Sequence, residues 1–308
     1  MRRCLVIGGG GFIGRHVVSL LAEAGHEVCV LGRRPEKPDG LHNKCRYISG
    51  DYGNRSTLKE ILTPGCEVID LAYSTVPKTS YEDAIYDLLS NLPASVGLFQ
   101  EALAAGVSRL LIVSSGGTVY GPPEYLPINE GHPTAPISPY GITKLTTDRY
   151  AMMFHRNAGL PVVIVRPANA YGADQKTGVG QGFLAAAIQA VLSGREIEIY
   201  GAQGTIRDFI HVTDIATGIV AALEKGKEGT IYNIGTGRGT STRQLVSMLE
   251  SLAQNDGLSV RSKILPSRQF DVEANVLDSS KLTAHSGWVP KASLGIGVEE
   301  MWHAVKSR

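Results

Sequence analysis

Short, mostly apolar runs alternate with longer segments of helical periodicity through the first half of the chain. Glycine, serine or charged residues follow each run, and the continuous apolar character is typical of strands buried on both faces of a parallel sheet. The runs predict strands at 4–7, 27–31, 47–51, 68–71 and 110–113, and the periodic segments predict helices at 12–24 and 84–106. With a sixth strand ending near Arg166, the alternation predicts an α/β fold with a doubly wound parallel Rossmann sheet.

The second half of the chain predicts a mixture of elements shared between two domains. We expect a helix at 182–193, an edge strand at 196–201, and a helix and strand at 213–225 and 230–234 that return to the main sheet. The final helix is expected near 298–305. These elements predict a dinucleotide-binding domain at 1–170 plus 207–237, and a smaller C-terminal α/β substrate domain at 171–206 plus 238–308. Pro93 is expected to kink the helix at 84–106 or to begin a new one, because proline lacks an amide hydrogen.

Three glycines spaced three residues apart follow the first predicted strand. Gly8, Gly11 and Gly14 lie where that strand meets a helix beginning with Phe12 and Ile13. In dinucleotide-binding folds the first glycine permits a tight turn, the second lets the backbone approach a pyrophosphate, and the third allows close helix packing. The position of the motif therefore predicts a dinucleotide site at these five residues, with a purely structural glycine turn as the alternative.

The residues after the second strand bear on the choice of cofactor. Folds that bind NAD often place Asp or Glu there to accept hydrogen bonds from the ribose. This chain has Gly32, Arg33 and Arg34 instead. Because guanidinium groups pair well with phosphate, the two arginines modestly favour the 2′-phosphate of NADP over NAD. NAD stays an alternative, as does a pair of solvated arginines without a ligand.

Two further strand ends complete the expected dinucleotide site. Asp51, followed by Tyr52, ends the third predicted strand and is placed to reach the adenine amine. Leu71, Ala72 and Tyr73 follow the fourth strand in a loop that we expect to pass under the cofactor. Both segments are assigned to the site because ligands of such sheets bind at the carboxyl ends of the strands.

A tyrosine and a lysine four residues apart begin the helix that leads to His155. Tyr140 and Lys144 lie on one face of that helix, downstream of a strand that ends in Ser114 and Ser115. A nearby cation favours the tyrosinate over the phenol, whose usual pKa is about 10, and makes a general base usable near neutral pH. We therefore expect a catalytic pair in which Lys144 lowers the pKa of Tyr140, rather than a surface pair.

With these motifs the chain resembles the extended short-chain dehydrogenase/reductases, specifically the NAD(P)-dependent nucleotide-sugar epimerase/dehydratase group that includes UDP-glucose 4-epimerase. The resemblance extends from Arg3 to Trp288 and includes Val-Tyr-Gly at 119–121, Arg-Pro-Ala-Asn-Ala-Tyr-Gly at 166–172 and Arg-Asp-Phe-Ile-His-Val at 207–212. It implies cofactor contacts from Asn91, Ser114, Tyr140, Lys144, Pro167 and Ala168. It implies substrate contacts from Thr75, Gly116, Gly117, Thr118, Asn169, Gly182, Phe183, Tyr200, Arg207, Arg268 and Asn275. In this group the two arginines bind the diphosphate, and Tyr200 is expected to stack on the nucleotide base.

Two departures from the group concern its catalytic side chains. The position three before Val119 carries Ser or Thr in the 4-epimerases and dehydratases, whereas this chain has Gly116. The hydroxyl that bridges Tyr140 and the sugar must therefore come from Ser115, from Thr118 or from water. The dehydratases also place Asp-Glu directly after that hydroxyl, where this chain has Gly-Thr, which argues against a 4,6-dehydratase.

Composition and charge narrow the class of protein. The chain has 308 residues, 43% of them hydrophobic, and a net charge of +1, so charge gives no argument for nucleic acid or an anionic membrane as a partner. No apolar run approaches the roughly 20 residues of a membrane span. The four scattered cysteines show no metal-ligand spacing, and the first strand leaves no room for a signal peptide. We expect a cytoplasmic, reduced, metal-free protein.

Three functional hypotheses follow from the sequence. The first is a nucleotide-sugar 4-epimerase, most simply a UDP-sugar enzyme, in which Tyr140 takes the C4 hydroxyl proton and a transient 4-keto sugar receives the hydride on its other face. The second is an NADPH-dependent 4-keto-sugar reductase, which Arg33 and Arg34 favour. The third is a non-catalytic dinucleotide-binding regulator, which Gly116 favours and the Tyr140/Lys144 pair argues against. The resemblance also implies a homodimer formed through a four-helix contact.

Overall fold

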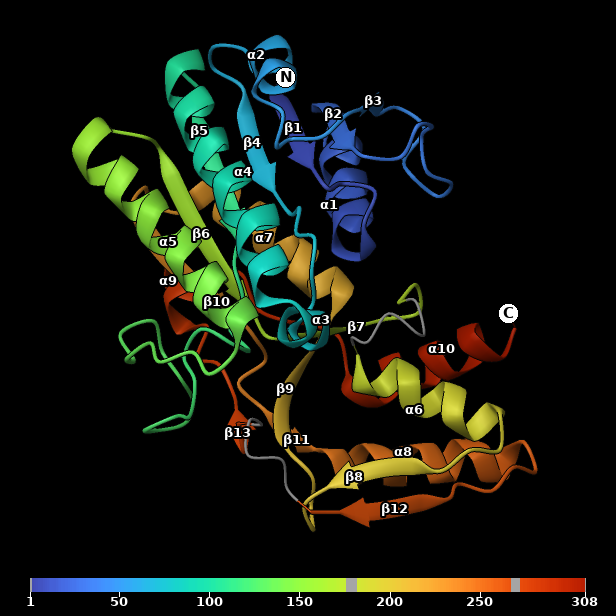
Figure 1. The fold of residues 1–308 in the computed structure, drawn as a ribbon. Helices are drawn as coiled ribbons and strands as arrows, with labels where there is room; N and C mark the ends of the chain where they lie inside the picture. Colours follow the sequence, from blue (N-terminus) through green and yellow to red (C-terminus); the bar gives the residue numbers. More distant parts are fainter. Residues whose placement is uncertain (1, 176–181, 267–271, 308) are drawn as a thin grey trace.

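A parallel sheet forms the centre of the computed structural model, which describes residues 2–175, 182–266 and 272–307 (Figure 1). Within these residues seven strands pair in the order β10-β6-β5-β4-β1-β2-β3, and every neighbouring pair is parallel. The strands are β1 (Arg3–Ile7), β2 (Glu27–Gly32), β3 (Arg46–Ser49), β4 (Glu67–Asp70), β5 (Arg109–Val113), β6 (Val162–Pro167) and β10 (Thr230–Ile234). This order confirms the predicted doubly wound Rossmann sheet.

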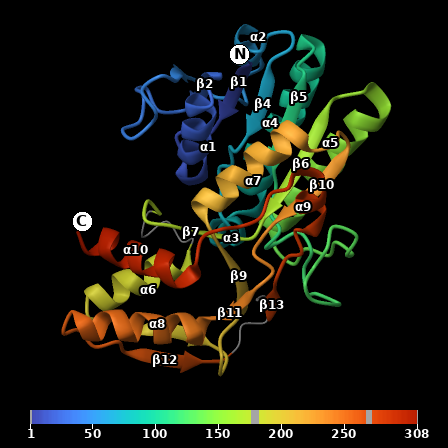
Figure 2. The same cartoon turned by 180° about the vertical axis from the view of Figure 1, so that it is seen from behind.

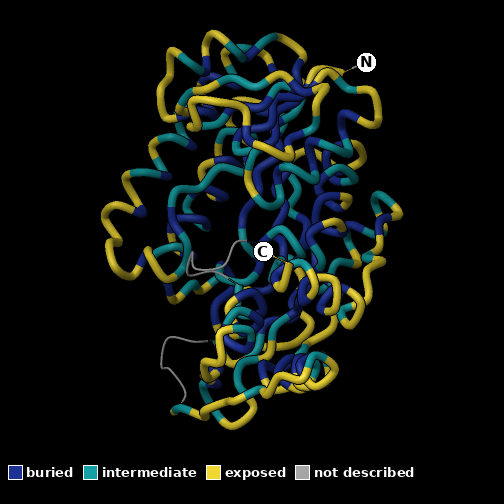
Figure 3. Tube along the Cα trace, turned by 90° about the vertical axis from the view of Figure 1, so that its right-hand side faces the viewer, coloured by how far each residue is buried: buried dark blue, intermediate teal, exposed yellow. Residues whose placement is uncertain are grey.

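Helices cover both faces of the sheet, which explains why its strands are continuously apolar. All residues of β4 and β6 are buried, as expected for strands with no solvent-facing side. Figure 1 shows one helical layer in front, formed by α2 (Arg55–Ile61), α4 (Ala84–Ala105) and α5 (Pro139–Ala158). Figure 2 shows the other, formed by α1 (Phe12–Glu23) and α7 (Val212–Lys225). Exposed residues lie mostly on the outer turns of the chain, and buried residues gather in its interior (Figure 3).

Separate hydrophobic cores fill the two faces. On one face Val18 of α1 and Ile219 of α7 pack with Val6 of β1. On the other, Phe99 of α4 packs with Val68 of β4, both fully buried. α4 runs unbroken through Pro93, so no new helix begins there, and the predicted kink stays a prediction. The carbonyl that loses its partner belongs to Leu89, which is 63% exposed, so water can satisfy it.

A smaller region lies beyond the carboxyl ends of the central strands. There β9 (Ile206–His211) pairs with β7 (Asn169–Tyr171), β11 (Gly239–Ser241) and β13 (Ala274–Asn275), and β8 (Ile197–Tyr200) pairs with β12 (Ser262–Leu265). Helices α6 (Phe183–Leu192), α8 (Thr242–Asn255) and α10 (Leu294–Lys306) enclose a third core around Trp302. Among the described residues β9 pairs only with strands of this region, although the predicted bounds place residues 207–237 in the dinucleotide-binding domain. The division into two domains stays a prediction. Helix α3 (Pro77–Glu82) packs against α4 and α5, and helix α9 (Ser280–Ser286) packs against α7 and β10.

The strand order creates the crevice that holds the candidate site. After β1 the chain continues into α1 on one face of the sheet, and after β4 it continues towards α4 on the other face. The loops that follow these two strands therefore diverge. Leu71 donates its backbone N–H to Ile7 at 3.0 Å, which holds the two strand ends together. Among the described helices, none is long and apolar enough to cross a membrane.

Candidate active site

The glycine turn after β1 has the close contacts that a dinucleotide site requires. Gly8 has a φ of +76°, and a Cβ there would lie 2.9 Å from the backbone nitrogen of Ala72. A Cβ on Gly14 would lie 2.5 Å from the carbonyl oxygen of Gly8, so glycine alone permits the packing of α1 on the turn. Gly11 caps α1 without a side-chain hydrogen bond, leaving first-turn N–H groups for an anion. The turn therefore fits a pyrophosphate.

Two cavities, each of about 1060 Å³ among the described residues, open beside this turn. Gly8, Gly11, Leu71 and Tyr73 line both, so the cavities meet there. The β2-side cavity also contains the predicted residues Arg33, Arg34, Asp51, Tyr52 and Ala72. The β5-side cavity contains Phe12, Ile13, Gly14, Thr75, Ser114, Ser115, Gly117, Thr118, Tyr140, Lys144, Pro167, Ala168, Asn169, Gly182, Phe183 and Arg207. The two halves of the predicted site thus occupy adjoining spaces.

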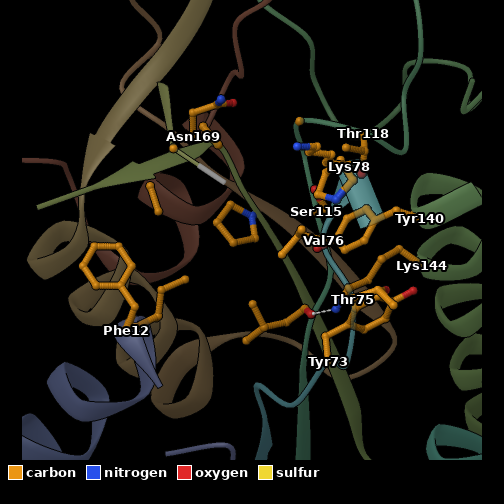
Figure 4. Close-up of a pocket in the computed structure, with 18 of the residues that line it drawn as sticks. Phe12, Tyr73, Thr75, Val76, Lys78, Ser115, Thr118, Tyr140, Lys144 and Asn169 are labelled. Carbon is orange, nitrogen blue, oxygen red and sulfur yellow. Dashed lines mark hydrogen bonds between the residues drawn. The ribbon is translucent and has the colours of Figure 1, made fainter. Parts of the chain in front are cut away.

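The first turns of α5 place Tyr140 and Lys144 on one wall of the β5-side cavity (Figure 4). Ser138 begins the helix by accepting a hydrogen bond from the Gly141 N–H at 3.1 Å. The Lys144 ammonium donates to the carbonyl oxygen of Val113, at the end of β5, at 2.9 Å. It lies 4.0 Å from the ring centroid of Tyr73 and 6.0 Å from that of Tyr140.

Burial controls the ionisation of this pair. It raises the pKa of the Tyr140 phenol, the Asp87 carboxylate raises it further, and a hydrogen bond with Ser115 lowers it. Burial lowers the pKa of Lys144 to about 8, against the opposing effect of nearby carboxylates. Burial therefore dominates the Tyr140 pKa, and the Lys144 ammonium is directed at Val113 and Tyr73. The expected lowering of that pKa by Lys144 stays a prediction.

The bridging hydroxyl has two candidates in the cavity wall. Ser115 interacts with the Tyr140 phenol and lowers its pKa, and Figure 4 shows both beside Thr118 at the same end of the cavity. The hydroxyl of Thr118 is buried and has no hydrogen-bond partner among the described residues. Since Ser115 contacts the phenol, it is the better candidate of the two.

Gly116 does not line the cavity, which corrects the prediction that it contacts substrate. Its backbone N–H donates to the Pro167 carbonyl at 2.9 Å. A Cβ at this position would lie 2.4 Å from Leu277 Cδ1 and 2.9 Å from the Arg166 carbonyl oxygen. Glycine is therefore required here by packing between the β5 and β6 loops.

Asn91 also lies outside both cavities, so its predicted cofactor contact is not seen. It is fully buried in α4, and its side-chain oxygen accepts the Ser74 N–H at 2.8 Å. Its amide nitrogen donates to the Asp87 carbonyl at 2.7 Å. The neighbouring Asp87 carboxylate accepts a short hydrogen bond from Thr75. Asn91 therefore fixes the loop after β4, which in turn lines the cavities.

Two further predicted substrate residues, Tyr200 and Asn275, differ from expectation. Tyr200 lies on β8 away from both cavities, and its hydroxyl donates to Glu198. Asn275 is buried behind the cavity wall, where its amide donates to the Gly116 carbonyl at 3.0 Å, so it supports the loop instead. Arg268 lies outside the described residues. Arg207 lines the β5-side cavity, where its guanidinium also donates to the Ile206 carbonyl at 2.8 Å.

Sequence reasoning missed several residues in loops of the β5-side cavity. Val76 and Lys78, from the loop after β4 and the start of α3, lie beside Ser115 and Thr118 (Figure 4). Gln175, from the loop after β7, is buried, and its side-chain oxygen has no partner among the described residues. These loops lack a motif, and the only available signal was their position after strand ends.

Comparison with known proteins places this site in a family. The NAD dependent epimerase/dehydratase family matches the chain over residues 4–235. The chain belongs to this family. It is 30% identical over 305 residues to a putative UDP-glucose 4-epimerase of Methanocaldococcus jannaschii, and the match covers 98% of each protein. The membership confirms the resemblance, shows that the chain is an enzyme, and supports a nicotinamide cofactor.

Solved structures extend the similarity to the whole fold. UDP-glucose 4-epimerase of Thermotoga maritima, determined with UDP-glucose, is 32% identical with a TM-score of 0.90, over 99% of each chain. UDP-glucose 4-epimerase of Thermus thermophilus, determined with NAD, is 31% identical with a TM-score of 0.89, again over 99% of each chain. This chain therefore has no large insertion or deletion relative to these two epimerases.

Proposed function

We propose that the protein is a nucleotide-sugar 4-epimerase and that its substrate is a UDP-sugar. The observation that carries the proposal is one cavity that joins the glycine turn, the hydroxyls of Tyr140 and Ser115, and the Arg207 guanidinium. Relatives of the same length and fold are named UDP-glucose 4-epimerases, which supports the choice of nucleotide. An arginine suits the substrate diphosphate because its planar fork can donate two parallel hydrogen bonds.

In the proposed reaction Tyr140 and Ser115 act on the C4 hydroxyl of the sugar. Ser115 holds the hydroxyl against the phenol, and tyrosinate at Tyr140 accepts its proton as the C4–H hydride leaves. The 4-keto sugar then turns, and Tyr140 returns the proton when hydride re-enters on the other face. The glycine turn and Lys144 would hold a nicotinamide dinucleotide, which would supply the hydride acceptor and a positive charge that favours tyrosinate. Net redox change is zero.

A product assay tests the reaction. Purified protein is incubated with UDP-glucose, UDP-glucuronic acid or UDP-N-acetylglucosamine, and the C4 epimer is measured by proton NMR together with reduced dinucleotide. We expect epimer without stoichiometric oxidation or reduction of the cofactor, and Tyr140→Phe should lose at least about a hundredfold in kcat. Tyr125→Phe removes an exposed phenol outside both cavities and serves as the matched control. Full turnover by Tyr140→Phe would refute the assignment.

The alternative function is an NADPH-dependent 4-keto-sugar reductase. Arg33 and Arg34 both line the β2-side cavity, where the loop is held by the Tyr47 hydroxyl donating to the Arg34 carbonyl at 2.8 Å. These cations support NADP, whereas the NAD-bound Thermus relative supports NAD. Mass spectrometry of the dinucleotide released from purified protein separates the two. Bound NAD favours the epimerase; an empty site that binds NADPH and consumes it with a 4-keto sugar favours the reductase.

We further propose that the protein is a homodimer that pairs α4 and α5 with their copies. These helices pack against each other and carry exposed apolar side chains that a monomer leaves in water. Ile85 and Leu89 of α4 are 70% and 63% exposed, and Ile142 of α5 is 54% exposed. Burial of such side chains in a symmetric contact is favourable.

A reducing compartment such as the cytoplasm fits the cysteines. All four are free thiols among the described residues, at Cys4, Cys29, Cys45 and Cys66. Burial raises the pKa of the Cys4 and Cys29 thiols, so neither has the thiolate character of a reactive cysteine. We infer that the thiols have packing roles.

A further inference from the structure

Tyr73 occupies the point where the two cavities meet. It belongs to the loop after β4 and lines both cavities. The Lys144 ammonium lies 4.0 Å from the centroid of its ring, and the Tyr140 ring meets it edge to face at 4.9 Å with an interplanar angle of 69°. Figure 4 shows the three side chains together on one wall. Tyr73 is thus in contact with both members of the catalytic pair.

Hydrogen bonds to helix α4 hold the loop that carries Tyr73. The next residue, Ser74, donates its backbone N–H to the Asn91 side chain at 2.8 Å. Thr75 donates its hydroxyl to the Asp87 carboxylate. Because Asn91 and Asp87 are both fully buried in α4, the ring of Tyr73 is attached to a rigid support.

The geometry gives the Lys144 ammonium a defined set of partners. An ammonium has three donors, and one is used by the Val113 carbonyl. The face of an aromatic ring carries the negative part of its quadrupole and attracts a cation. The Tyr73 ring therefore holds a second side of the ammonium and leaves the remaining direction for a ligand hydroxyl. Burial raises the pKa of the Tyr73 phenol, so the ring stays neutral and acts through its face.

We propose that Tyr73 is a positioning residue that holds the Lys144 ammonium and the Tyr140 ring in the arrangement used for catalysis. Its kinetic consequences rest on the proposed epimerase function, whereas its effect on Lys144 does not. Tyr73 moves no proton itself. It acts by stabilising the charged form of Lys144 and by limiting the orientations of Tyr140.

A pH profile distinguishes this role from simple packing. Carboxylates face Lys144 from three elements, namely Asp70 of β4, Asp87 of α4 and Asp148 of α5, and each favours the ammonium. Burial opposes them and lowers the Lys144 pKa to about 8. These groups remain in a variant that lacks only the aromatic ring. Loss of the ring removes a further stabilisation of the cation, so the Lys144 pKa should fall by about one unit.

The kinetic experiment compares Tyr73→Leu with Tyr73→Phe, which keeps the ring and removes only the hydroxyl. For Tyr73→Leu we expect kcat to fall about tenfold, KM for the sugar nucleotide to change less than about threefold, and the alkaline limb of kcat to move about one pH unit lower. Tyr73→Phe should keep most of the wild-type kcat and the wild-type position of the alkaline limb. Tyr125→Leu, the same substitution at an exposed ring outside the cavities, controls for general effects. An unmoved alkaline limb in Tyr73→Leu, or a Phe variant as defective as Leu, would overturn the proposal.

A spectroscopic measurement keeps the test independent of activity. In protein labelled with 13C at lysine Cε, the Lys144 resonance is identified by its absence from Lys144→Met and titrated in each variant. We expect a lower Lys144 pKa in Tyr73→Leu than in the wild type and Tyr73→Phe. If that shift appears but no nucleotide sugar is epimerised, the positioning role holds and the proposed function fails. Equal pKa values in all three proteins would refute the role of Tyr73 whatever the activity.

Discussion

Replacing Gly116 with serine introduces the residue type that the sequence resemblance led us to expect at this position, and the structure predicts that it will harm the protein. The new Cβ would lie 2.4 Å from Leu277 Cδ1 and 2.9 Å from the Arg166 carbonyl oxygen. Leu277 is fully buried, so its side chain has no free space to move into. The backbone carbonyl is fixed in β6, since Arg166 pairs with Asn233 in the sheet. The contact must therefore be relieved by displacement of the loop.

The cost has two parts. Overpacking a dense core typically costs about 1–3 kcal/mol, and a buried hydroxyl without a partner adds about 1 kcal/mol or more. We therefore expect Gly116→Ser to lower the free energy of unfolding by about 2–4 kcal/mol. For a chain of this size, that corresponds to a fall in Tm of about 4–8 °C. Catalysis should not improve, because the added hydroxyl does not face the cavity.

Urea unfolding followed by circular dichroism measures the stability, and the epimer assay measures kcat. Gly295→Ser is the matched control, since the nearest atom to a Cβ there is 4.0 Å away, and its stability should change by less than about 0.5 kcal/mol. Ser115→Ala should keep its stability and lose at least about tenfold in kcat. Equal stability of the Gly116 and Gly295 variants, or a faster Gly116→Ser enzyme, would show that the reasoning about this position is wrong.

Three further predictions concern the core, the cofactor and the assembly. Asp148→Asn removes the carboxylate charge that pairs with the buried Arg166 guanidinium at 2.9 Å, so urea unfolding should show a loss of about 3–5 kcal/mol, and an unchanged midpoint would contradict this. Alanine at both Arg33 and Arg34 should weaken NADPH binding about tenfold in fluorescence titrations while leaving NADH within about twofold; equal losses would remove the NADP argument. Ile142→Asp should convert a dimer to monomer in light scattering, whereas Ile296→Asp, at a similarly exposed position on α10, should not.

The sequence predicted those features that depend on neighbours along the chain. The central sheet follows from continuous apolar runs, and the dinucleotide side follows from Gly8, Gly11 and Gly14, whose spacing has a local mechanical reason. Tyr140 and Lys144 share a wall because a four-residue spacing fixes their relative direction on α5. Each of these inferences needed one segment only.

The remaining features depend on residues that meet only in the folded chain. Gly116 was assigned to the substrate because of its place in a motif, but Leu277 and Arg166 decide its environment. Asn275 is turned towards the Gly116 carbonyl by the pairing of β13 with β9. The effect of Lys144 on Tyr140 depended on how deeply both are buried, and no spacing reports burial at a cavity wall.

The wall shared by the two cavities makes the affinities of their ligands interdependent. Both binding surfaces include Gly8, Gly11, Leu71 and Tyr73. A ligand that orders these residues in one cavity therefore changes the conformational entropy that is lost when the second ligand binds in the other. Thermodynamic linkage requires the resulting factor to be the same in both directions. A UDP-nucleotide that tightens dinucleotide binding by a given factor must itself be bound more tightly, by that same factor, when the dinucleotide is present. The effect of the dinucleotide on sugar-nucleotide affinity and the effect of the sugar nucleotide on dinucleotide affinity are therefore two measurements of one coupling free energy.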